Sequence, residues 1–143
     1  MSSRKNAATS IDTSLRAISI GSFLFQSSLA ADLGLHPTDL QAIHLLGGTS
    51  GRSAGELAES LGLTTGSTTA LIDRIERLGY VKRTRDENDR RKVVVTLNPP
   101  KIADLRQRYR FIDQRIAALL KERSDEQLIV IAEFLEAVAR SSK

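Results

Sequence analysis

The segment from Ser53 to Gly79, SAGELAESLGLTTGSTTALIDRIERLG, most constrains the fold because it encodes two capped helices separated by a very short turn. Its first four residues form a capping box, in which serine and glutamate side chains accept hydrogen bonds from the first backbone N–H groups of the helix. Gly62 suits the left-handed conformation that ends a helix. Thr64 is a favourable N-cap for a second helix, Thr65 to Leu78. Two helices joined in this way predict a helix-turn-helix.

After Gly79 the hydrophobic period changes from that of a helix to that of a strand. Tyr80–Thr84 and Lys92–Leu97 flank a charged turn, which predicts a two-stranded hairpin. A glycine-rich stretch, Gly47 to Ser53, precedes the helix-turn-helix. Such a stretch could cradle a phosphate, but it lacks the Lys-Ser/Thr pair of a P-loop. We therefore interpret it as a flexible connection.

Amphipathic helices are predicted on both sides of this central segment. Apolar residues at helical spacing indicate one helix over residues 11–33 and a second from Thr38, where Thr-Asp-Leu-Gln forms a capping box. After the hairpin, Asn98 and Pro99 suit the start of a further helix, and Ser124 caps a final one. The predicted fold is mainly α with a small β-hairpin wing (α+β).

The helix after Pro99 carries a narrow apolar seam. Its members recur every three or four residues over nearly three heptads: Ile102, Leu105, Tyr109, Ile112, Ile116 and Leu119. That spacing is typical of a helix that packs against another helix. A monomer of 143 residues would have difficulty covering such a seam, so the pattern favours association with a second copy.

Positive charge is concentrated in one part of the chain. The formal net charge is +4, and eight of the 21 Lys and Arg residues lie between Arg74 and Lys92. Such a cluster favours a face that binds a polyanion. No run approaches the ~20 apolar residues of a membrane span, and the polar N-terminus does not resemble a secretory signal. We therefore expect a cytoplasmic protein without a membrane partner.

Composition also argues against catalysis and metal binding. The chain has no cysteine, which excludes disulfides and thiolate ligands. His36 and His44 are the only histidines, and neither accompanies a recognisable nucleophile. Eight residues apart, they are too distant to act as a ligand pair on one helical face, and carboxylates would have to complete any zinc shell. We predict no enzyme activity, no metal and no cofactor.

The helix from Thr65 to Leu78 has an apolar stripe and an N-terminal half of small polar residues. Threonine and glycine are costly in a helix that is merely solvated, whereas small hydroxyl side chains suit close approach to a major groove. Arg74 lies nearer to that half than Arg77, so it is the better candidate for a base or phosphate contact. Arg77 is predicted to be structural, since Asp73 and Glu76 can neutralise these arginines on the helix surface.

The helix-turn-helix followed by GYVKRTRDENDRRKVVVTL resembles the winged-helix domain of the MarR family of transcriptional regulators. Asp89-Arg90-Arg91 matches the Asp-Arg-Arg signature of the family's wing, and Gly79-Tyr80-Val81 and Arg85 match the residues that precede it. The resemblance covers residues 11 to 140, and its motifs lie between residues 53 and 97. Leu97-Asn98-Pro99-Pro100-Lys101 departs from the family's Leu-Thr-Pro-x-Gly, but the same helix can begin either way.

The resemblance implies a homodimer on a pseudo-palindromic operator in double-stranded DNA, with recognition helices in major grooves and wings over flanking minor grooves. It further implies a repressor released by a small aromatic or anionic effector. We accordingly predict four parts: a flexible N-terminal tail (1–10), a dimerisation helix (11–36), a winged helix-turn-helix DNA-binding domain (37–98) and C-terminal dimerisation helices (99–143).

The candidate DNA-contacting residues lie in the helix-turn-helix and the wing: Arg52, Ser53, Thr64, Thr65, Gly66, Ser67, Thr69, Arg74, Arg85, Asp89, Arg90 and Arg91. Within the wing, Arg90 is assigned to the minor groove, whose negative potential attracts arginine. Asp89 is expected to orient a neighbouring arginine. Arg85 and Arg91 are expected to contact phosphates or to pair with Asp89.

An effector of the family's kind would lie between the dimer helices and the DNA-binding lobe. The residues that can line such a space are Arg16, Phe23, Phe25, His36 and His44. The alternative function is an architectural or protein-interacting winged-helix module without sequence specificity. A protein-interaction face on the second helix of the motif would show exposed aromatic or aliphatic side chains, and its N-terminal half has none in the sequence.

Overall fold

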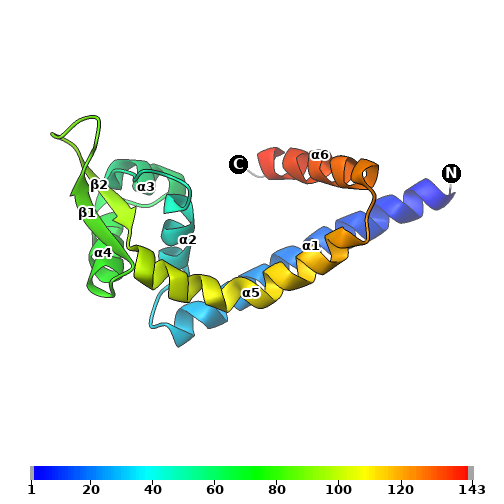
Figure 1. The fold of residues 1–143 in the computed structure, drawn as a ribbon, viewed down its shortest axis with the longest axis horizontal. Helices are drawn as coiled ribbons and strands as arrows, with labels where there is room; N and C mark the ends of the chain where they lie inside the picture. The colour runs from blue at the N-terminus through cyan, green and yellow to red at the C-terminus, as the bar shows by residue number, and fades with distance from the viewer. Residues whose placement is uncertain (1, 142–143) are drawn as a thin grey trace. The chain divides into compact units, whose positions relative to one another are not determined.

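The computed structural model describes residues 2–141 (Figure 1). The elements follow in the order α1 (Ser2–Asp32), α2 (Pro37–Leu46), α3 (Ala54–Leu61), α4 (Thr65–Arg77), β1 (Val81–Arg85), β2 (Val93–Leu97), α5 (Pro99–Lys121) and α6 (Asp125–Ser141). After Lys101 the described chain divides into two compact units, the first with α1 to β2 and the second with most of α5 and all of α6. The predicted mainly α fold with a hairpin wing is confirmed.

The helix α1 begins at Ser2 and not at residue 11. Residues 2–10, predicted as a flexible tail, are therefore helical. They include Ala7 and Ala8 and contain neither glycine nor proline, so no residue among them breaks a helix. The hydroxyl of Thr9 donates a hydrogen bond of 3.0 Å to the carbonyl of Lys5, as in a continuous helix. The prediction was wrong because it took polar composition alone as a sign of a tail.

The start of α2 also differs from the prediction. Its N-cap is His36, and Pro37 occupies the first helical position, so the expected cap at Thr38 is wrong. The carboxylate of Asp39 accepts a 2.8 Å hydrogen bond from the backbone N–H of His36. Proline favours this arrangement because its fixed φ suits a first helical position and it forces the preceding residue into an extended conformation.

The helix-turn-helix forms by the predicted caps. The N–H of Ser53 donates to the carboxylate of Glu56 at 2.7 Å, and the N–H of Glu56 donates to the Ser53 hydroxyl at 3.2 Å. Gly62 ends α3 in the left-handed conformation, with φ 64°. The hydroxyl of Thr64 accepts from the N–H of Ser67 at 3.2 Å and so caps α4.

The strands β1 and β2 pair in antiparallel fashion, with Val81 opposite Leu97 and Arg85 opposite Val93. Arg52 extends this hairpin through two backbone hydrogen bonds with Val95, of 3.1 and 2.7 Å. The end of the glycine-rich connection, which we predicted to be flexible, is therefore held to the wing. Because the partners are 43 positions apart, local sequence gave no sign of this pairing.

The core of the first unit joins the helix-turn-helix to the root of the wing. The largest of its fully buried apolar side chains come from α2, α3 and α4: Leu40, Leu46, Leu57, Leu71, Ile72 and Ile75. Val81, Val94 and Val95 of the strands are buried with exposures of 6% or less. The helix α2 contacts α1, α3, α4 and β2, so it is the element that most of this unit shares.

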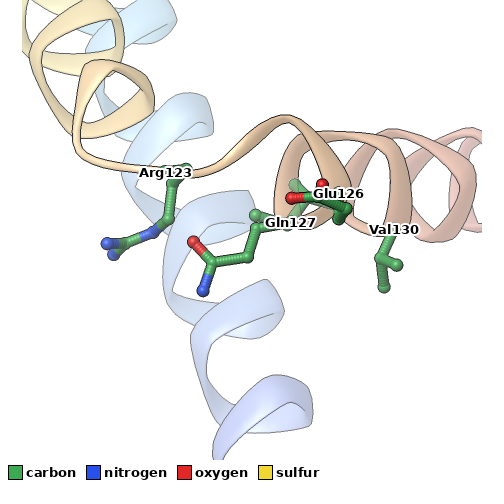
Figure 2. A pocket seen from close by; sticks show the side chains of 5 residues that line it. Arg123, Glu126, Gln127 and Val130 are labelled. Atoms are coloured by element: carbon green, nitrogen blue, oxygen red, sulfur yellow. The ribbon is translucent and has the colours of Figure 1, made fainter.

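The second unit contains a pocket at the start of α6. Ser124 caps this helix as predicted, because its hydroxyl accepts from the N–H of Gln127 at 3.3 Å. The pocket has a volume of about 400 Å³ and an almost wholly apolar surface; Figure 2 shows the side chains that line it, Arg123, Glu126, Gln127, Val130 and Ile131. None of the residues predicted for an effector site is among them.

No single described helix is long and apolar enough to cross a membrane. Residues 3–32 and 37–46 meet the length and composition requirements only when taken together, and the two helices are bent by 102° at the break between them.

Gly51 provides a test of the pairing between the connection and the wing. Its φ is +126°, and an added Cβ would lie 2.9 Å from Cγ2 of Thr96 and 3.0 Å from Cγ2 of Val94. We expect Gly51→Ala to lower the free energy of unfolding by about 1–3 kcal/mol, measured by urea denaturation. Gly55→Ala is the matched control, because its Cβ would meet only the Ser53 hydroxyl at 3.9 Å in a helix. Equal stability losses in both variants would contradict this account.

Candidate nucleic-acid interface

The exposed N-terminal half of α4 consists of small side chains: Thr65, Gly66, Ser67, Thr69 and Ala70. Thr68 is the exception, since it is 1% exposed and its hydroxyl donates to the carbonyl of Thr64 at 2.9 Å. The opposite side of the helix, with Leu71, Ile72 and Ile75, is buried in the core. The predicted separation of α4 into a polar and an apolar face is therefore present in the structure.

The N-terminus of α4 also favours an anion. The backbone dipoles give a helix a partial positive charge at this end, and the first turn of α4 contains no acidic residue that would neutralise it. Thr64 occupies the N-cap, and its hydroxyl donates to the Ser67 hydroxyl at 3.0 Å. Phosphate groups bind well at helix ends of this kind.

The structure gives Arg74 a partner that the sequence analysis did not find. Its Nε lies 2.8 Å from Oδ2 of Asp39, and its Nη2 lies 2.7 Å from Oδ1. These hydrogen bonds raise the pKa of Arg74. The guanidinium thus binds α2, and the predicted contact with a base or phosphate has no support in this geometry. The partners are 35 residues apart, so helix-surface spacing could not have linked them.

The acidic neighbours on α4 also have an unexpected partner. Asp73 and Glu76 both form ion pairs with Arg83 of β1, and not with Arg74 and Arg77 as predicted. The backbone N–H of Arg83 donates a further bond of 3.0 Å to Glu76. These contacts tie the first wing strand to α4. Arg77, predicted to be structural, is exposed and forms no hydrogen bond or ion pair within the described chain.

Asp86 organises the backbone of the wing turn. Its carboxylate accepts hydrogen bonds from the N–H groups of Asp89, at 2.7 Å, and Asn88, at 2.8 Å. These two bonds hold the pKa of Asp86 below its usual value. The N–H of Asp86 donates to the carbonyl of Lys92, and the N–H of Lys92 donates to the carbonyl of Asp89, both at 2.9 Å. Aspartate commonly builds turns by accepting from the backbone in this way.

Asp89 also bonds to the backbone, which corrects its predicted role. Its carboxylate accepts from the N–H of Arg91 at 3.1 Å, and among residues 2–141 it holds no guanidinium. Arg85 donates from Nη1 to the carbonyl of Arg90 at 2.9 Å. The acids of the turn therefore fix its main chain, and the side chains of Arg85, Arg90 and Arg91 are exposed on it. In Figure 1 this turn extends beyond α3 and α4.

The other two candidate positions, Arg52 and Ser53, make structural bonds beside the wing. The guanidinium Nε of Arg52 donates to the carbonyl of Leu45 at the end of α2, at 3.0 Å. Ser53 caps α3 through its bonds with Glu56. Both residues are partly exposed, next to the strand β2 that Arg52 joins.

The residues predicted for an effector site are distributed over α1 and the two ends of α2. Arg16 forms an exposed ion pair of 3.0 Å with Asp12. Phe23 is 66% exposed, and Phe25 is half-buried. His36 is exposed at the N-cap of α2. Partial burial of the His44 ring lowers the pKa of His44. The described residues contain no group of three or more side chains that could hold a metal ion.

Known proteins share this arrangement of helix-turn-helix and wing. Residues 33–92 match the model of the MarR family. Over 123 residues the chain is 40% identical to YcgE of Bacillus subtilis (strain 168), named as an uncharacterized HTH-type transcriptional regulator, with 84% of this chain and 78% of that protein covered. The chain belongs to the MarR family of transcriptional regulators. It is accordingly a DNA-binding regulator, and the family is one of regulators and not of enzymes.

Solved structures share the fold of this chain. A MarR family protein from Bacillus stearothermophilus superposes with a TM-score of 0.69 and 23% identity, covering 96% of each chain. FabT of Streptococcus pneumoniae, solved in complex with DNA, gives a TM-score of 0.67 and 22% identity, covering 93% of this chain and 95% of that one. At these identities the likeness establishes the winged-helix fold of this MarR-family protein.

The role of Asp86 in this MarR-family wing can be tested by removing its carboxylate. We expect Asp86→Ala to weaken DNA binding severalfold, because the turn loses the acceptor of two backbone N–H groups. Glu87→Ala is the control, since it removes the same charge from an exposed position in the same turn. That change should leave binding equal or tighter, because it removes repulsion from DNA. Tighter binding by both variants, measured by fluorescence anisotropy, would show that Asp86 is only a solvated charge.

Proposed function

We propose that the protein is a homodimeric, sequence-specific repressor that binds a pseudo-palindromic site in double-stranded DNA and is released by a small-molecule effector. One observation carries the DNA-binding part of this proposal. A helix with an exposed small polar half and a turn with exposed arginines belong to the same compact unit. Both are attached to one core, so they can engage one duplex together.

The exposed half of α4 favours base recognition over the alternative of a protein-interaction or architectural module. Thr65, Ser67 and Thr69 can hydrogen-bond to base edges or phosphates, and Gly66 and Ala70 allow the helix to approach closely. Interfaces between proteins are richer in aromatic side chains and methionine. This half of α4 exposes neither type of residue. The proposal therefore assigns α4 to a major groove.

The wing suits an adjacent minor groove. Arg90 and Arg91 are exposed on a turn whose backbone is fixed by the carboxylates of Asp86 and Asp89. A turn ordered before binding loses less conformational entropy when it meets DNA. Arginine is attracted to the negative potential of a narrow minor groove. We assign Arg90 to that groove and Arg91 to phosphates.

Exposed apolar side chains support a homodimer. Except for Val93 of β2, the large ones lie on three helices, α1, α5 and α6: Ile11, Ile18, Ile20, Phe23, Leu24, Phe111, Ile116, Leu119, Leu120, Ile129, Val130, Phe134 and Leu135. Within the α5 seam, Ile102 and Leu105 are buried, whereas Ile116 and Leu119 are 50% and 60% exposed. Soluble monomers rarely expose so much apolar surface, so we assign these helices to contact with a second copy.

A two-fold dimer would place its two recognition helices in successive major grooves, with half-sites about 34–36 Å apart. Effector release follows the family's usual mode. Arg16, Phe23 and Phe25 on α1 and His36 and His44 on α2 would supply the aromatic and cationic groups for a small aromatic or anionic effector. An effector can release DNA only if it binds the DNA-free state more tightly than the bound state.

Dimerisation is tested by sedimentation at micromolar concentration. We expect the wild type to sediment at about twice 15.7 kDa. Leu119→Lys should shift the equilibrium toward monomer, because it buries a charge in the proposed contact. Gln114→Lys adds the same charge at an exposed polar position of α5 and should remain dimeric. A wild-type monomer would refute the dimer and the half-site geometry.

Sequence specificity is tested by selecting binding sites from a random pool of duplexes. The wild type should enrich a pseudo-palindrome with A/T-rich flanks. Arg90→Ala should retain the half-sites but lose the flank preference, and its slope of log K against log salt should fall by ~0.9 per lost phosphate-equivalent contact, nearly twice that in a dimer. Lys5→Ala, which removes an exposed cation from α1, should leave both unchanged. A pool without enrichment would favour the architectural alternative.

A further inference from the structure

Asp39 is the only charged side chain that is buried among residues 3–141, for which side-chain exposure is described, and its exposure is 0%. Its carboxylate accepts three hydrogen bonds: from Nε of Arg74 at 2.8 Å, from Nη2 of Arg74 at 2.7 Å, and from the N–H of His36 at 2.8 Å. The side chain of Arg74 is 25% exposed. A two-pronged ion pair therefore joins α2 to the recognition helix inside the first unit.

Such a pair contributes more to geometry than to net stability. Moving a carboxylate out of water is costly, and the attraction of its partner largely offsets that cost without exceeding it. The offset is lost, however, if either group moves away, because the carboxylate is then buried without a partner. The planar guanidinium can donate both hydrogen bonds only when the two carboxylate oxygens lie in one orientation. The pair therefore fixes both the position of α4 relative to α2 and the rotation of α4 about its own axis.

The position of α4 matters most at its other end. Arg74 lies in the last turn of the helix, and Thr65 begins it. Nine residues at 1.5 Å each separate them by about 13 Å, so a tilt of about 5° at Arg74 would displace Thr65 by about 1 Å. Hydrogen bonds to base edges tolerate less, since good N–H···O distances span only about 2.7–3.2 Å. Contacts with phosphates through exposed, mobile cations are far less sensitive.

We propose that Asp39 and Arg74 are positioning residues that set the DNA sequence discrimination of this protein by fixing the angle of α4. Arg74 acts through Asp39 and not by touching DNA. This inference rests on the proposed sequence-specific binding, and it assigns that specificity in part to a contact remote from the exposed face of α4.

A direct contact between Arg74 and DNA would give the opposite result at Asp39. If Arg74 bound a phosphate, Asp39→Asn would release its guanidinium and tighten binding to every duplex. If the pair positions α4, the same change loosens the helix and weakens binding to the selected site alone. Arg74→Lys separates the two cases again, because lysine keeps a charge for a phosphate but cannot form both bonds to the carboxylate.

The experiment measures Kd for the selected duplex and for an unrelated duplex of equal length, at one salt concentration and below the unfolding temperature of each variant. We expect Asp39→Asn, Arg74→Gln and Arg74→Lys each to lower the ratio of specific to unrelated affinity by at least about tenfold. Base preferences within the half-site should broaden. The double variant Asp39→Asn/Arg74→Gln should lose no more than the worse single variant, because both changes break one interaction.

Two matched controls remove the same charges from exposed positions. Arg77→Gln acts on the same helix, and Glu59→Gln acts on α3; both should keep the wild-type ratio. Circular dichroism establishes that each variant is folded. If a single variant does not fold, the double variant, in which two amides replace the two charges, decides the question by the same ratio.

Two outcomes overturn the inference alone. In one, the wild type prefers the selected duplex and the Asp39→Asn variant has the same ratio of specific to unrelated affinity. In the other, an Arg74→Gln variant loses affinity for both duplexes at an unchanged ratio while Arg74→Lys keeps the wild-type affinity for both, which would identify a direct phosphate contact. A wild type without discrimination would instead refute the proposed sequence-specific function on which the inference rests.

Discussion

Leu40, Ala42, Ile43 and Leu46 of α2 have exposures of 3% or less, and the helix they belong to contacts α1, α3, α4 and β2. Burial of this apolar surface is the constraint on which the DNA-binding unit depends. The same helix provides Asp39 for Arg74 of α4, and its last turn provides the Leu45 carbonyl for Arg52 beside the wing. Contacts with α2 thus position both α4 and the wing, so a displacement of this one helix would move both.

The wing shows how a turn rich in arginine can be ordered. Like charges repel, and a turn held only by its side chains would lose much entropy on ordering. Here Asp86 and Asp89 accept from backbone N–H groups, so the main chain is fixed while Arg90 and Arg91 remain exposed. At the root, Arg83 binds Asp73 and Glu76 of α4. The wing therefore holds its position relative to α4 through ion pairs at its root. The exposed arginines of the turn take no part in these pairs.

Local signals in the sequence predicted the fold well and the site only in part. The caps at Ser53, Thr64 and Ser124 form as expected, because a capping bond joins residues three apart and needs no tertiary contact. The roles of Arg74 and Asp89 were not predictable in the same way. Arg74 pairs with a residue 35 positions away. That Asp89 bonds to the backbone, and not to an arginine side chain, became clear only from the conformation of the turn.

The sequence by itself determined the helix-turn-helix, the hairpin, the Asp-Arg-Arg turn and the apolar seam of α5, since each follows from local propensity and periodicity. The tertiary structure decided which charged residues are exposed and which are paired. It placed Asp39 in the core, where a carboxylate must have a partner, and that requirement committed Arg74 to α2. Burial depends on contacts between residues remote in sequence, so no local pattern could have assigned it.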